Sequence, residues 1–133
     1  MIIGLPQEVK NNEFRVGLTP GNVRGLCKQG HSVLVQRGAG EQIGLSDESY
    51  RLAGANLINS AAEVFAKAEM VVKVKEPQPQ ECAMLREEQI LFTYLHLAPD
   101  PKQTQALIGS GATCIAYSTS TYETGLKMPT INA

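Results

Sequence analysis

Short apolar runs alternate with short amphipathic stretches along almost the whole sequence, and this alternation restricts the fold more than any other feature. The apolar runs have the length of strands, and the stretches between them carry helical spacing and capping residues. The predicted strands are 1–5, 31–36, 55–58, 69–75, 90–98 and 113–117. The predicted helices are 20–29, 46–53, 61–68, 79–86 and 100–108. This pattern indicates a three-layer α/β/α domain with a mainly parallel sheet and right-handed crossovers.

The stretch ILFTYLHLA at 90–98 reads as a buried strand that ends in a polar side chain, His96. Pro99 and Pro101 stop the strand directly afterwards. In open α/β sheets ligands bind outside the carboxyl ends of the strands, and an imidazole there can exchange a proton near neutral pH. His96 is therefore a candidate catalytic residue. The alternative is a histidine that is hydrogen-bonded in the core or at a strand edge.

Two cations are expected at the same edge of the sheet. Lys75 ends the apolar strand 69–75, with Lys73 two residues back on the same face, and Arg15 lies in the loop after the first strand. The alternative for the lysines is a solvated position at a strand end. Guanidinium binds a carboxylate through two hydrogen bonds, and lysine supplies a point charge. Arg15, Lys75 and His96 together therefore predict a pocket for a small carboxylate.

The acidic side chains beside these residues have two interpretations. Glu13 and Glu76 could orient the cations, or they could be ordinary surface carboxylates, which the sequence alone favours. If the two cations lie near His96, charge repulsion would lower the pKa of its imidazole and keep it neutral, ready to accept a proton.

The segment GAGEQIG after the second predicted strand resembles a nucleotide-binding loop, but its spacing does not fit one. Gly38, Gly40 and Gly44 form GxGxxxG, one residue longer than the dinucleotide fingerprint, and the next helix starts only at 46–47. A strand-to-helix loop that needs positive φ angles explains these glycines better. No GxxxxGK[ST] segment occurs. We therefore predict no cofactor-binding residues in this chain.

Composition excludes several classes of function. The net charge of −1 gives no electrostatic basis for binding nucleic acid or an anionic membrane. There is no secretory leader and no run long enough to span a bilayer, so we expect a cytoplasmic protein. Cys27, Cys82 and Cys114 are widely spaced and odd in number, which argues against a disulfide framework or a metal site.

Four segments together are specific enough to suggest a family. They are IIGLPQEVKNNEFRVGLTP, the GAG loop with SDESY, AEMVVKVKEPQPQE, and ILFTYLHLAPD. With them the chain resembles the N-terminal substrate domain of bacterial alanine dehydrogenases, from residue 1 to about 117. The resemblance implies a flavodoxin-like domain, close to the catalytic domain of formate/glycerate dehydrogenases. The transhydrogenase alpha subunit shares this fold, but it looks different around KVKEP and TYLHLA.

The resemblance also implies roles. Family members interconvert L-alanine and pyruvate plus ammonia with NAD as hydride carrier, and they are commonly homo-oligomers. Arg15 and Lys75 would hold the carboxylate and carbonyl of the substrate, and His96 would exchange a proton with the substrate oxygen. The oligomeric state of this chain is left open by its sequence.

The sequence departs from the family pattern at its end. We expect 1–117 to be the substrate-binding domain and 118–133 to be an exit segment toward an NAD-binding domain that this chain lacks. The expected function is therefore the substrate-binding half of an alanine dehydrogenase, inactive alone. The alternatives are a non-catalytic remnant or small-carboxylate binding module, and the N-terminal domain of a transhydrogenase alpha subunit.

Overall fold

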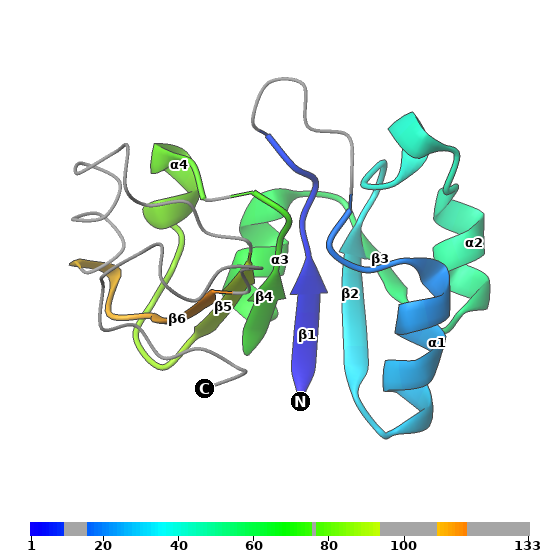
Figure 1. Ribbon diagram of the computed structural model, residues 1–133, viewed down its shortest axis with the longest axis horizontal. Coiled ribbons are helices and arrows are strands. Elements are labelled where there is room, and N and C mark those ends of the chain that lie inside the picture. The colour runs from blue at the N-terminus through cyan, green and yellow to red at the C-terminus, as the bar shows by residue number, and fades with distance from the viewer. Residues whose placement is uncertain (10–15, 76, 94–108, 117–133) are drawn as a thin grey trace.

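The computed structural model of the chain describes residues 1–9, 16–75, 77–93 and 109–116. They form a six-stranded sheet whose strand order is β3-β2-β1-β4-β5-β6 (Figure 1). The strands are β1 (Ile2–Leu5), β2 (Ser32–Gln36), β3 (Asn56–Ile58), β4 (Met70–Val72), β5 (Ile90–Thr93) and β6 (Thr113–Ala116). Every pair of neighbouring strands is parallel, which confirms the predicted α/β class.

Helices connect these strands along the chain. They are α1 (Pro20–Lys28), α2 (Asp47–Leu52), α3 (Ala61–Lys67) and α4 (Pro79–Cys82), with a short 3₁₀ helix at Glu41–Ile43. The three longer helices begin at hydroxyl caps, because Thr19, Ser46 and Ser60 each accept a hydrogen bond from the backbone N–H three residues later. Thr19, Ser46 and Ser60 are therefore the N-caps of α1, α2 and α3.

The core lies on both faces of the sheet. One cluster joins α1 and α2 to side chains of β1, β2 and β4, with the buried Tyr50 at its centre. The other joins α3 and α4 to Val71 and Leu91 on the opposite face of β4 and β5. Because successive side chains of a strand point to opposite faces, neighbours such as Val71 and Val72 enter different clusters. The arrangement has the three layers that the sequence predicts.

Gly4 in β1 allows α3 to lie close to the centre of the sheet. A Cβ atom at Gly4 would lie 2.7 Å from Ala68 Cβ and 2.7 Å from Val64 Cγ1. The side chains of Arg86 and Gln89, which lie between α4 and β5, bind carbonyl groups at the C-terminal end of α3. The buried Gln89 amide donates to the carbonyls of Phe65 and Ala68 at 2.6 and 2.9 Å.

Two predicted elements are shorter in the structure. The predicted strand 69–75 ends at Val72. The N–H of Lys73 still donates to the Phe92 carbonyl of β5, but the N–H groups of Val74 and Lys75 bind the carboxylate of Glu8 in place of a neighbouring strand. The predicted helix 79–86 ends at Cys82, with Ala83 as its C-cap. The side chain of Leu85, beyond this end, packs into the core. Strand 90–98 is observed as far as Thr93, and its remainder and the predicted helix 100–108 lie outside the described residues.

Candidate functional site

The order of the strands reverses between β1 and β4. From β1 the chain continues outward to β2 and β3, whereas β4 leads to β5 and β6 on the other side (Figure 1). In doubly wound sheets this switch point opens a crevice at the carboxyl ends of the strands, and ligands bind there. The segments that leave β1 and β4 at this edge contain Glu8 and residues 73–75. The fold thus places Lys75 where the sequence predicts a ligand.

Three charged side chains are buried together beside this edge, and we call Glu8, Lys73 and Glu81 the charge cluster. Lys73 Nζ lies 3.0 Å from Glu8 Oε1 and 3.0 Å from Glu81 Oε2. Their side chains are between 1% and 3% exposed, so water screens these charges poorly. The contact with Glu81 is at ion-pair distance but outside hydrogen-bond geometry, whereas the contact with Glu8 is also a hydrogen bond.

Two carboxylates share one ammonium in this cluster, and the pKa of one of them, Glu81, is shifted. Burial raises the pKa of Glu81, and the positive charge of Lys73 offsets only part of that effect. Protonation of Glu81 would leave a neutral pair of Glu8 and Lys73 in the interior. Removing one partner of a buried pair typically costs about 3–5 kcal/mol, because the remaining charge is uncompensated. The charge cluster is therefore a fixed part of the fold at this edge.

The main chain of Lys75 is held on both sides. Its N–H donates to Glu8 Oε1 at 3.2 Å, and its carbonyl accepts a hydrogen bond from Thr93 Oγ1 at 2.9 Å. Thr93 is fully buried at the end of β5, so it is a rigid anchor. The Lys75 side chain is only partly buried, and within the described ranges its ammonium has no hydrogen bond or ion pair. A ligand anion could therefore bind this ammonium without first displacing a partner among these residues.

The structure places one of the three predicted site residues. Lys75 is described, whereas Arg15 and His96 lie outside the described residues, as do Glu13 and Glu76. The convergence of Arg15, Lys75 and His96 on one cleft stays a prediction.

Lys73 differs from what the sequence indicates. It was expected at the ligand edge beside Lys75 or in solvent, but it is 2% exposed as a residue and paired with two carboxylates. Glu8 and Thr93 were missed altogether. The position of Glu8, three residues after the end of β1, was the available signal, because the same edge argument that selects Lys75 applies to it.

The glycine loop has the predicted positive φ angles at Gly38 and Gly44 but not at Gly40, whose φ is −109°, and the loop does not suit a dinucleotide. Gly38 and Gly44 have φ angles of 85° and 82°, in the region that favours glycine. The N–H of Gly38 donates to the carboxylate of Asp47 at 2.8 Å, so an acidic side chain occupies the direction from which a phosphate would approach. At Gly40 a Cβ would lie 2.8 Å from Leu45 Cβ, which is a packing requirement within the loop. These residues do not fit a bound NAD.

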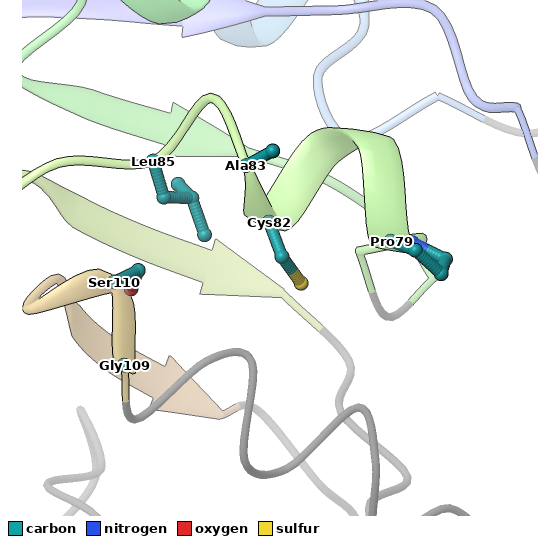
Figure 2. A pocket seen from close by; sticks show the side chains of 6 residues that line it. All are labelled: Pro79, Cys82, Ala83, Leu85, Gly109 and Ser110. Atoms are coloured by element: carbon teal, nitrogen blue, oxygen red, sulfur yellow. The ribbon is translucent and has the colours of Figure 1, made fainter.

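A hollow of about 410 Å³ lies between α4 and the segment that precedes β6 (Figure 2). It is lined by Pro79, Cys82, Ala83, Leu85, Gly109 and Ser110. Burial raises the pKa of the Cys82 thiol, which makes it a poor nucleophile at neutral pH. This lining supplies no cation for a carboxylate, so the hollow does not match the chemistry expected at the carboxyl edge.

The described residues show no other kind of site. Among them, no three His, Cys, Asp or Glu side chains are grouped so that they could hold a metal ion. No helix in the described part of the chain is both long and apolar enough to cross a membrane.

Comparisons with known proteins agree with one another. The family model for the alanine dehydrogenase/PNT N-terminal domain matches residues 4–132. Alanine dehydrogenase from Bacillus subtilis is 54% identical over 119 residues, which are 90% of this chain and 31% of that protein. Alanine dehydrogenase from Mycolicibacterium smegmatis is 49% identical over 119 residues, again 90% of this chain and 32% of the relative. The chain thus spans about a third of the length of these relatives.

Solved structures show the same relationship. An L-alanine dehydrogenase superposes with a TM-score of 0.85 and 49% identity, covering 88% of this chain and 32% of that one. A transhydrogenase from Sinorhizobium meliloti superposes with a TM-score of 0.81 and 28% identity, covering 87% of this chain and 34% of that one. Both similarities extend over most of the chain.

Proposed function

The chain belongs to the alanine dehydrogenase/PNT family through its N-terminal domain, and on this premise we propose that it binds pyruvate or L-alanine as the substrate-binding half of an alanine dehydrogenase. The observation that carries the proposal is Lys75. Its main chain is fixed at the switch point of the sheet by Glu8 and Thr93, and its ammonium is unpaired among the described residues. A small 2-oxo acid or 2-amino acid would supply the missing negative charge.

Each proposed site residue has a separate role. Arg15 binds the substrate carboxylate through two hydrogen bonds, and Lys75 polarises the carbonyl. His96 exchanges a proton with the substrate oxygen, which a neutral imidazole can do near pH 7. We assign these roles to a domain of residues 1–117, and 118–133 to an exit segment toward an NAD-binding domain.

The complete reaction would oxidise L-alanine with NAD and water to pyruvate, ammonia, NADH and a proton. Because the glycine loop does not fit a dinucleotide, we assign no cofactor contact to the described residues. NAD is the hydride acceptor of that reaction, and residues outside this loop would bind it. The chain spans about a third of its relatives, so activity of the whole enzyme is part of the proposal, together with a cytoplasmic location and a homo-oligomeric assembly.

The alternative is the N-terminal domain of a transhydrogenase alpha subunit. It is supported by the close superposition on the transhydrogenase, at 28% identity. The alanine dehydrogenases share about half of the aligned residues with this chain, and the lysine and histidine of the proposed site are needed only by the dehydrogenase. These two differences favour the alanine dehydrogenase.

The test is a titration of the chain with pyruvate in which NMR monitors the resonances of the His96 ring. We expect dissociation constants around the millimolar level, because an open cleft leaves the cations screened by water. Arg15→Ala and Lys75→Ala should weaken the shift of the His96 resonances strongly. Lys67→Ala is the matched control, because that exposed lysine pairs with Glu63 within α3 and not with a residue of the proposed site. Equal titration of all three variants would show that the carboxylate-binding roles are wrong.

A further inference from the structure

We propose that Glu8 is a positioning residue, which fixes the main chain of Lys75 so that its ammonium is presented at the ligand edge of the sheet. The inference rests on the proposed function in one respect, because the ligand that the Lys75 ammonium would bind is the substrate proposed above. The geometric part of the inference concerns only described residues.

The two oxygens of the Glu8 carboxylate are divided between neighbouring donors. Oε2 accepts a hydrogen bond from the N–H of Val74 at 2.9 Å. Oε1 accepts from the N–H of Lys75 at 3.2 Å and from Lys73 Nζ at 3.0 Å. Three donors from consecutive residues of one segment therefore converge on one side chain that lies more than 60 residues earlier in the chain. Such convergence restricts the segment in position and in direction.

Glu8 itself is held in place by the extension of β1. The N–H of Gln7 donates to Gln36 Oε1 at 2.8 Å, which ties this extension to the end of β2. On the other side of the 73–75 segment, the N–H of Lys73 donates to the Phe92 carbonyl at 2.9 Å, and Thr93 binds the Lys75 carbonyl. The segment is thus bridged between β1 and β5 at the point where β4 has ended.

The charge of Glu8 suits positioning better than stability alone. A buried ion pair can often be replaced by apolar side chains with no loss of stability, so burial of charge is weak evidence for a stabilising role. An apolar side chain could not accept the N–H groups of residues 74 and 75, however, and those groups would then need water or a different backbone path. Lys73 supplies the counter-charge that allows a carboxylate to be buried here.

The test compares Glu8→Gln with Glu81→Gln, two isosteric changes in the same charge cluster. Glu81 contacts Lys73 and the N–H of Gln78, but it does not contact the main chain of residues 74 and 75. We expect amide hydrogen exchange at Lys75 to become at least about tenfold faster in Glu8→Gln and to change less than about twofold in Glu81→Gln. Pyruvate affinity, measured by NMR titration, should fall about tenfold in Glu8→Gln alone.

Unchanged protection of the Lys75 amide in a folded Glu8→Gln variant would overturn the inference, and so would equal loss of pyruvate affinity in both variants. If the unaltered chain does not bind pyruvate, the proposed function fails, and the exchange rates alone then decide the positioning role. If Glu8→Gln does not fold, Glu8→Asp and Glu81→Asp replace the pair. Each of these keeps all three charges and shortens one carboxylate side chain, and the same difference at Lys75 is expected between them.

Discussion

Substitution of Gly4 by alanine should destabilise the domain although it adds only one methyl group. Nonbonded carbon atoms normally stay about 3.5–4.0 Å apart, whereas the new Cβ would lie 2.7 Å from Ala68 Cβ and from Val64 Cγ1. Neither neighbour can rotate away, because alanine has no side-chain torsion and a valine in a helix is confined to one rotamer. Helix α3 must therefore move outward from β1 by roughly 1 Å.

The expected magnitude follows from two opposing effects. Overpacking of this kind typically costs about 1–3 kcal/mol, and the lower backbone entropy of an unfolded chain with alanine returns about 0.5–1 kcal/mol. We expect a net loss of about 1–2 kcal/mol in the free energy of unfolding, measured by urea denaturation.

Gly25→Ala is the matched control for this measurement. Gly25 lies inside α1 and a Cβ there would meet nothing within 4 Å, so alanine should stabilise the domain by about 0.5–1 kcal/mol. The two variants carry the same chemical change, but their free energies of unfolding should shift in opposite directions from that of the original chain. A Gly4→Ala variant as stable as Gly25→Ala would refute the argument that α3 is held against the sheet at this distance.

Two further predictions concern acidity and cofactor. Because burial raises the pKa of Glu81 above 4.5, the folded chain keeps a proton that the unfolded chain has released. Stability should therefore fall as the pH rises above 4.5, until Glu81 ionises in the folded state as well. The free energy of unfolding of Glu81→Gln should lack this fall, and parallel pH profiles of the two proteins would contradict the assignment. NADH should show no micromolar affinity for this chain by fluorescence titration, since the Gly38 N–H is taken by Asp47; saturable binding that Asp47→Asn strengthens would restore the glycine loop as a nucleotide site.

The sequence was sufficient for the class of fold because each local signal pointed the same way. Hydroxyl caps at Thr19, Ser46 and Ser60 and the apolar runs between them locate the helices and strands. The order of the strands could not be predicted in this way, since the direction in which each crossover turns depends on contacts between distant segments. The position of the switch point between β1 and β4 therefore came only from the structure.

The candidate site was predicted in part for the same reason. Lys75 was found from its place at the end of an apolar strand, which is a local property. Lys73 was assigned to the same face and the same edge, but its partners Glu8 and Glu81 lie in other segments, after β1 and in α4, so the strand pattern does not indicate that it is buried. Alternation along a strand says which side chains share a face, and it says nothing about which of them another segment will cover.

One of the two strands at the centre of the sheet, β1, comes first in sequence among the strands that the structure describes. Residues 2–5 pair with β2 on one side and, through Ile3 and Gly4, with β4 on the other, so they alone join the two halves of the sheet. Residues 2–5 leave the ribosome before the other strands of this sheet, yet they cannot complete their pairing until residue 71 has left it as well. Loss of residues 2–5 would remove the shared strand and leave a two-stranded piece, β2 and β3, separate from a three-stranded piece, β4, β5 and β6. A purification tag fused before Met1 should disturb the sheet less than loss of residues 2–5. Such a tag would leave from the edge where the parallel strands begin, which is opposite to the edge that carries Lys75.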